Sequence, residues 1–266
     1  MKKVVVMFAA AALTLPFVSC KENPKDPITE TQEIQQEIPS EDLALATEND
    51  LDSKLVETYK YVTAPSGLSL REYNNLQSKK LGKMPYGTKV KILTPEVKQT
   101  MTVGGISGAM DEVEFNHKKG FAFNGYLSKY FPPERDITVN GYAEELQRQF
   151  PEVSYAKTAE GTASKPITVE TITLPEANWH EAFFMAQQLF DFPKEFTFPS
   201  AKGKDFQVIQ DNMPKKNVWT SQLEISRKDD ALTNIAYVYT SQKLITTVTV
   251  EKEGTLMKIS RKESMK

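Results

Sequence analysis

Apolar and polar residues alternate in short runs along residues 57–131, and turn-forming residues separate the runs. Residues 68–71 and 89–93 each alternate with the period of two that a half-buried strand requires. Residues 95–109 add a hairpin, with Gly104-Gly105 at its turn. The other strand candidates are residues 59–62, 112–115 and 121–123. Many short strands with a turn signal about every ten residues predict a small β-barrel over residues 57–132.

Three glycines of this region are expected to supply special backbone conformations. Glycine adopts a positive φ at little steric cost, so we expect it at Gly87 in a tight turn. We expect the same at Gly120, in a hairpin loop over residues 116–120, and at Gly125, at a strand end. The interior of the barrel is expected to be filled by leucines with Val90, Ile92 and Val113.

A different pattern follows Pro132-Pro133, a stiff boundary between two parts of the chain. Tyr142, Leu146 and Phe150 recur every four residues and predict a short helix. Residues 166–173 form a strand candidate. A second helix carries one apolar stripe and ends at Phe192-Pro193; a capping box at Thr173 and Glu176 is expected to start it. The stripe consists of Trp179, Phe183, Ala186 and Phe190.

Four strand candidates then follow one another with short turns between them. They cover residues 218–226, 232–239, 244–250 and 255–259. Asp229-Asp230, Ser241-Gln242 and Glu253-Gly254 supply the turns, which favours an antiparallel meander. We therefore expect a mainly β chain in which the barrel precedes an α+β domain, with helices packed on a meander sheet, over residues 135–266.

The first twenty residues have the pattern of a targeting signal. Lys2 and Lys3 precede an apolar stretch over residues 4–15, which is too short to span a membrane comfortably. Residues 21–56 hold ten acidic residues and three lysines, a net charge of −7, with few aromatic side chains. That composition predicts a disordered, charge-extended tether over residues 20–56. The whole chain has a net charge of −2, of which Lys2 and Lys3 supply +2 and residues 21–56 supply −7, so residues 57–266 carry +3.

Phe17-Val18-Ser19-Cys20 resembles the lipobox of bacterial lipoproteins. The resemblance implies that residues 1–19 are a lipoprotein signal peptide and that acyl chains such as palmitate are attached at Cys20. Two or three acyl chains anchor a protein durably in a membrane. Lys21 follows the cysteine where Asp signals inner-membrane retention in some bacteria, which favours the outer membrane or periplasm. An ordinary secretory signal with an incidental cysteine is the alternative.

Composition excludes several classes of protein. The chain has one cysteine and two histidines among 266 residues, too few for an intramolecular disulfide or a Cys-rich zinc site. Its nearly balanced charge argues against nucleic-acid binding. We expect no cofactor and no metal.

An ordered set of motifs in residues 57–132 resembles the bacterial SH3-like (SH3b) domain. The set begins with Ser66-Gly67-Leu68-Ser69-Leu70-Arg71 and continues with Leu81-Gly82 and Met84-Pro85-Tyr86-Gly87-Thr88-Lys89-Val90. It closes with Val113-Glu114-Phe115 and Gly120-Phe121-Ala122-Phe123-Asn124-Gly125-Tyr126-Leu127-Ser128. The resemblance covers under a third of the chain and implies a module that binds cell-wall peptides or targets enzymes to the wall.

Aromatic residues of this module are the candidate ligand-binding residues. They are Tyr61, Tyr73, Tyr86, Phe121 and Tyr126. The alternative, which the sequence favours for most of them, is that they pack the barrel or its neighbour.

No catalytic constellation accompanies the module. The chain lacks G-x-S-x-G, the P-loop, G-x-G-x-x-G and H-E-x-x-H. A papain-like wall peptidase needs a catalytic cysteine, and the single cysteine is assigned to lipid. His180 next to Glu181 is expected to be an exposed helix residue, and His117 a solvated turn residue. Asp229-Asp230 needs no metal as a hairpin turn.

We therefore expect a non-enzymatic, lipid-anchored envelope protein whose SH3-like module binds peptidoglycan or an envelope protein. One alternative is a structural or assembly subunit of an envelope complex. The other is a hydrolase with scattered carboxylates in its C-terminal domain.

Overall fold

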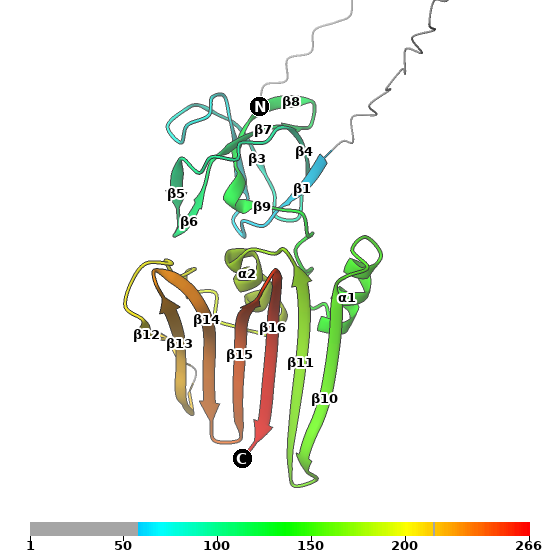
Figure 1. The fold of residues 1–266 in the computed structure, drawn as a ribbon, viewed down its shortest axis with the longest axis vertical. Helices are drawn as coiled ribbons and strands as arrows, with labels where there is room; N and C mark the ends of the chain where they lie inside the picture. The colour runs from blue at the N-terminus through cyan, green and yellow to red at the C-terminus, as the bar shows by residue number, and fades with distance from the viewer. Residues whose placement is uncertain (1–57, 215) are drawn as a thin grey trace, which may run out of the picture. The chain divides into compact units, whose positions relative to one another are not determined.

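The computed structural model describes residues 58–214 and 216–266, and the chain in these ranges is mainly β with two α-helices. Its sheets are antiparallel, which confirms the expected fold class. The described residues belong to one compact unit, Lys54–Lys266 (Figure 1). The expected signal peptide, the acidic tether and Cys20 lie outside the described residues. None of the described helices has the length and hydropathy that a membrane span requires.

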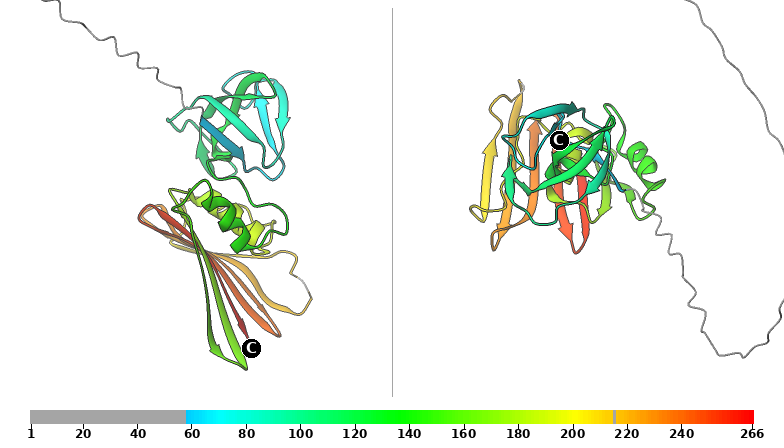
Figure 2. Two further views of the ribbon diagram at one scale, coloured as in Figure 1. Left: turned by 90° about the vertical axis from the view of Figure 1, so that its right-hand side faces the viewer. Right: turned by 90° about the horizontal axis from the view of Figure 1, so that it is seen from above.

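The first sheet has seven strands in the order β3-β2-β8-β7-β4-β1-β9, and it curls around an apolar interior (Figure 2). Val62, Met84, Val90 and Val113 are fully buried there. A separate two-stranded hairpin, β5 and β6, and the 3-10 helix η1 (Asn124–Tyr126) complete this part. The strands are β1 (Thr58–Val62), β2 (Leu68–Arg71), β3 (Lys80–Met84), β4 (Lys89–Thr94), β5 (Met101–Val103), β6 (Ile106–Gly108), β7 (Met110–Phe115), β8 (Lys118–Phe123) and β9 (Leu127–Ser128).

The expected positive φ is wrong for two of the three glycines. Gly87 has a φ of 78°, as a tight turn requires, but Gly120 and Gly125 do not have positive φ. The turn between β7 and β8 consists of Asn116 and His117 alone, both with positive φ and both exposed. Gly120 instead lies inside β8, where a Cβ would be 2.6 Å from the carbonyl oxygen of Arg71. Close backbone approach, rather than turn geometry, therefore requires glycine there.

A buried polar network ties β7 to the segment that follows β8. The Asp111 side chain is fully buried and accepts hydrogen bonds from Asn124 Nδ2 at 2.8 Å and from the Glu96 backbone N–H at 2.9 Å. Lys60 Nζ lies 3.3 Å from the other Asp111 oxygen. Asn124 also accepts from the Ala109 N–H and donates to the Glu96 carbonyl oxygen at 3.1 Å, so one amide joins its own segment to residues 109–111 and to Glu96. A buried carboxylate held in this way is stabilising only while its partners remain.

The second sheet has seven strands in the order β10-β11-β16-β15-β14-β13-β12. The expected meander is confirmed as β13 to β16, joined in register by short turns. Two edge strands, β10 and β12, were not anticipated, because their mostly exposed residues show little apolar alternation. The strands are β10 (Ser154–Thr162), β11 (Lys165–Pro175), β12 (Phe206–Gln210), β13 (Val218–Lys228), β14 (Ala231–Ser241), β15 (Leu244–Glu253) and β16 (Leu256–Met265).

Both helices pack against this second sheet. Helix α1 (Val139–Gln147) contacts β10 and β11, and α2 (Trp179–Leu189) contacts β15 and β16. The strand register aligns a row of fully buried β-branched side chains beneath them, one from each of five adjacent strands. The row consists of Ile172, Ile259, Val250, Ile235 and Ile225.

The capping box that starts α2 is formed by other residues than the sequence predicts. Thr173 and Glu176 do not form its capping box, because β11 continues to Pro175 and Glu176 occupies a turn with a φ of 58°. The capping box is formed by Asn178 and Glu181 instead. Glu181 Oε2 accepts from the Asn178 backbone N–H at 2.6 Å, which satisfies a donor at the helix start.

We expect Gly120→Ala to lower the free energy of unfolding by about 1–3 kcal/mol, because its methyl group meets backbone rather than a movable side chain. Gly82→Ala is the matched control, since a Cβ on Gly82 has no atom within 4 Å. We expect it to change stability by less than about 0.5 kcal/mol. Urea unfolding of both variants measures the difference, and equal stabilities would contradict the close-approach explanation.

Candidate ligand-binding cleft

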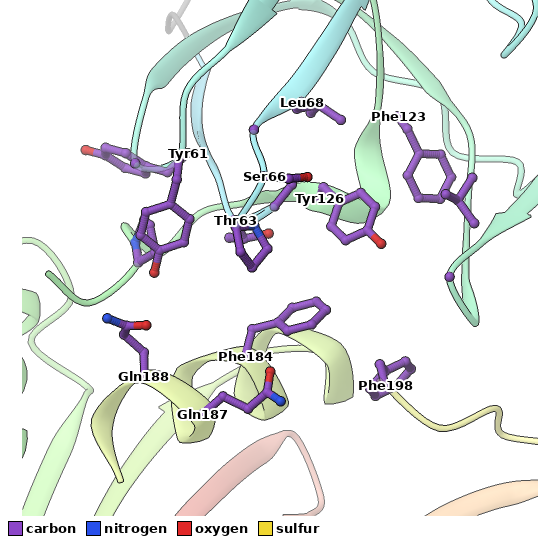
Figure 3. Close-up of a pocket in the computed structure, with 18 of the residues that line it drawn as sticks. Tyr61, Thr63, Ser66, Leu68, Phe123, Tyr126, Phe184, Gln187, Gln188 and Phe198 are labelled. Carbon is purple, nitrogen blue, oxygen red and sulfur yellow. The ribbon is translucent and has the colours of Figure 1, made fainter. Parts of the chain in front are cut away.

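A cleft of about 1180 Å³ opens beside the first sheet (Figure 3). Its size is slightly above the range of about 300–1,000 Å³ common for small-molecule sites. Its lining includes the β1–β2 connection at residues 63–67, the link at residues 131–135, helix α2 and the loop at residues 194–198, together with further side chains of the first sheet and its connections. The cleft is therefore composite, built from segments far apart in the sequence.

Aromatic side chains form much of its wall. The Tyr126 ring lies 6.2 Å from that of Phe184, and the Tyr61 ring lies 5.9 Å from that of Phe131. Figure 3 shows Phe184 extending from α2 toward the side of the cleft that carries Tyr126. These rings offer flat apolar faces with the phenolic hydroxyls of tyrosine beside them.

Helix geometry explains why Phe184 lines the cleft. Phe183 is fully buried in the core of the second sheet, and successive helical residues point about 100° apart. Phe184 therefore lies at the edge of that core, against which it still packs, and it also packs against the core of the first sheet. Gln187, one turn later, donates to the carbonyl oxygens of Pro193 and Phe196, both at 2.9 Å. These two bonds hold the following loop against α2 and so place Phe198.

The cleft also contains polar groups that the protein leaves available. The Oγ1 atom of Thr63 is buried and has no hydrogen-bond partner among the described residues. Leaving a buried hydroxyl unpaired costs about 1–3 kcal/mol. The side-chain amides of Gln149 and Gln188 and the hydroxyl of Tyr126 likewise bond to no other side chain or backbone group in the described part. Unlike the buried Thr63 hydroxyl, these three groups are accessible to a ligand with donors and acceptors.

The ionisable groups of the lining make the cleft positive. The lining contains three cationic residues and one carboxylate, Glu134; the cations are Arg71, Arg135 and Lys194. Arg71 donates from Nη1 to the Ser78 carbonyl oxygen at 2.8 Å, which leaves its other donors for a second acceptor. The arrangement favours a ligand that carries a carboxylate or another acidic group.

Tyr86 fixes one wall of the cleft. Its hydroxyl donates to the Pro133 carbonyl oxygen at 3.2 Å, and burial raises the pKa of Tyr86 to about 12. Burial also raises the pKa of Tyr126. Both phenols are therefore neutral hydrogen-bonding groups at physiological pH.

The structure brings together three of the five aromatic residues proposed from the sequence. Tyr61, Tyr86 and Tyr126 line the cleft. Tyr73 lies outside it, 60% exposed in the β2–β3 connection. Phe121, on β8, packs against the first core and does not line the cleft.

Sequence reasoning missed the cleft residues of the second part. Phe184, Gln188 and Phe198 come from α2 and the loop after it, and Thr63 was not singled out. One signal was present: Phe184 is a large apolar residue beside, rather than on, the stripe through Phe183. An off-stripe aromatic on an amphipathic helix indicates a second packing surface.

His180 is half-buried, so the expectation of an exposed residue is wrong. Its ring lies 5.9 Å from the Phe198 ring, and burial lowers its pKa. The neighbouring carboxylate, Glu181, is engaged in capping α2, so the two do not form a catalytic pair.

Two carboxylates in and beside the second sheet, Glu170 and Asp211, are engaged by structural partners. Glu170 accepts from Arg261 and pairs with Lys157; burial opposes its ionisation, but these bonds outweigh burial and lower the pKa of Glu170. Asp211 accepts from Ser221 at 2.7 Å. Among the residues that the structure describes, no group of three or more His, Cys, Asp or Glu could hold a metal ion.

Comparisons with protein-family models, curated proteins and solved structures find no match to this chain. The cleft is therefore interpreted from its own chemistry.

We expect stability to fall as the pH rises from 10 toward 12, in part through Tyr86. An unfolded tyrosine ionises near pH 10, whereas the folded state holds the Tyr86 proton to about pH 12, so the unfolded state is favoured in this window. Denaturant unfolding at intervals between pH 9 and 11.5 measures the decline. Tyr86→Phe should make it shallower, and an unchanged slope would contradict the raised pKa.

Proposed function

We propose that this protein is a lipid-anchored cell-envelope protein that binds peptidoglycan in the composite cleft. The observation that carries the proposal is the cleft itself, whose aromatic walls, unpaired polar groups and excess of cations occur together. Binding sites combine apolar walls with a few polar groups that orient the ligand.

The chemistry of peptidoglycan matches each of these elements. Its sugar rings have apolar faces that fit against tyrosine and phenylalanine rings, as Tyr126 and Phe184 offer. Its N-acetyl and peptide amides pair with hydroxyl and amide groups such as those of Tyr126 and Gln188. Its peptide carboxylates suit Arg71, Arg135 and Lys194.

The proposal includes an SH3-like identity for the first sheet, supported by where its motif residues lie. Leu68 and Leu70 point into the core of the curled sheet, and Gly87 forms the turn before β4. Tyr126, in the closing motif, lines the cleft. The proposed site differs from a groove confined to this module, because α2 and the loop after it supply the facing wall.

The anchor is proposed at Cys20, on the outer membrane or in the periplasm rather than on the inner membrane. The support comes from the sequence: an apolar stretch ending in a lipobox-like Phe17-Val18-Ser19-Cys20, then Lys21 rather than Asp. The acidic segment over residues 20–56 would link the anchor to the folded unit.

We expect Cys20→Ala to abolish lipid attachment, because only a thiol can form the thioether to diacylglycerol. In bacteria grown with labelled palmitate, the unaltered protein should incorporate label and partition into detergent. The variant should lose the label and be recovered as an uncleaved or soluble form. A mature-size, membrane-bound Cys20→Ala protein would contradict the assignment.

We expect Phe184→Ala to weaken binding to purified sacculi by about tenfold or more, because central aromatic residues dominate binding energy. The protein used is the chain from residue 21, which carries no lipid. Gln188→Ala should weaken binding to a smaller degree. Tyr73→Ala is the matched control, since this exposed tyrosine lies outside the cleft, and it should bind as the unaltered protein does.

Two results would overturn the peptidoglycan assignment. One is retention on sacculi no greater than that of an unrelated protein of similar charge. The other is equal loss of binding in the Phe184 and Tyr73 variants. Crosslinking in intact cells then tests the alternative, in which the protein is an assembly subunit with a stoichiometric protein partner.

A further inference from the structure

Four large apolar side chains are exposed around one end of the second sheet. Trp219 near the start of β13 is 66% exposed, and Met213 in the preceding loop is 76% exposed. Ile245 at the start of β15 and Met265 at the end of β16 are 37% and 46% exposed. Strand pairing brings these elements together, because Leu244 pairs with Met265 and Val218 with Ser241 (Figure 1). Ile245 pairs with Ser264, so Ile245 and Met265 flank this end of the sheet from opposite faces. We call the four residues around this end the Trp219 surface.

Lysines surround this surface. Lys266 Nζ lies 3.7 Å from the centroid of the Trp219 ring, and the Lys266 backbone N–H donates to the Lys243 carbonyl oxygen. Lys216 and Lys262 are also exposed on the adjoining loop and strand. The nearby carboxylate of Asp211 accepts from Ser221 and from the Met213 N–H, so it is engaged within the protein. Glu263, two residues before Met265, is a second nearby carboxylate, so the four lysines outnumber the two carboxylates around this surface.

Exposed apolar residues bordered by lysines are typical of surfaces that contact the boundary between lipid headgroups and hydrocarbon. Tryptophan is enriched where hydrocarbon meets lipid headgroups, because its ring is apolar and its N–H is polar. Lysines next to it are attracted to anionic headgroups and reach them on flexible stems. None of these residues lines the cleft, so no ligand bound there would cover them.

We propose that the Trp219 surface docks on an anionic lipid bilayer. Trp219, Met213, Ile245 and Met265 enter the boundary between headgroups and acyl chains, and the lysines contact the headgroups. This contact is separate from an acyl anchor and from the cleft. It would hold the folded unit in a defined orientation on the membrane surface.

The test uses the lipid-free chain from residue 21 with vesicles of phosphatidylcholine, with and without 30% phosphatidylglycerol. Flotation should show binding to the anionic vesicles that weakens as salt is raised. Trp219→Ala should reduce the bound fraction about tenfold. Phe206→Ala is the matched control, because Phe206 is 58% exposed on the edge strand β12 and lies outside the surface.

Fluorescence gives a second readout that is independent of flotation. In a Trp179→Phe background, the emission of Trp219 should shift to shorter wavelength on anionic vesicles. Reversing two lysines, in a Lys243→Glu and Lys266→Glu variant, should abolish the shift. Lys252→Glu, which changes an exposed lysine elsewhere on β15, should preserve it.

The proposal is overturned if the unaltered chain does not bind anionic vesicles. It is also overturned if Trp219→Ala and Phe206→Ala bind equally well, or if the Trp219 shift follows protein concentration without lipid, which would indicate a second copy of the chain. Peptidoglycan binding by the same preparations is measured separately, so a chain that does not bind vesicles can still be tested for binding in the cleft.

Discussion

Phe184 and Phe198 each pack against both hydrophobic cores, and the cleft depends on that double contact. Phe184 can do so because it follows Phe183 on α2: the helix buries the Phe183 ring inside the second core and directs the Phe184 ring to the edge of that core, where it also reaches the first. Phe198 is placed by the loop that Gln187 holds against the helix. The Gly104-Gly105 turn accommodates this arrangement, since a Cβ on Gly105 would meet the Phe198 carbonyl oxygen at 2.9 Å.

Sequence pattern predicted the elements that bury an alternating or helical face. The meander from β13 to β16 and the stripe of α2 fall in this class, because their periodicity reflects burial on one side. The edge strands β10 and β12 were not predicted, because an edge strand buries few side chains and so needs no alternation of apolar and polar residues. Gly120 illustrates a second limit: its sequence context suits a turn, whereas the carbonyl of Arg71, 49 positions earlier in the chain, creates the actual requirement.

The candidate site was only partly predictable for a related reason. Tyr61, Tyr86 and Tyr126 could be selected because they lie within one recognisable module. Nothing local in the sequence places Thr63 opposite α2, or makes Gln187 a loop support and Gln188 a cleft residue. Those roles arise from tertiary contacts, which single-sequence periodicity does not contain. The aromatic residues on the other wall could be found only once both cores were placed.

The cleft is difficult to explain as a by-product of folding. Folding alone favours closing an apolar hollow and pairing a buried hydroxyl, because dispersion contacts and hydrogen bonds are lost otherwise. Here the walls are apolar, Thr63 Oγ1 is unpaired within the described residues, and Gln188 is held at the rim rather than bonded across it. The molecule secures its stability elsewhere, in features such as the buried Ile172–Ile225 row and the Asp111–Asn124 network. The proposed ligand would fill this hollow and recover part of the contacts that folding alone leaves unmade.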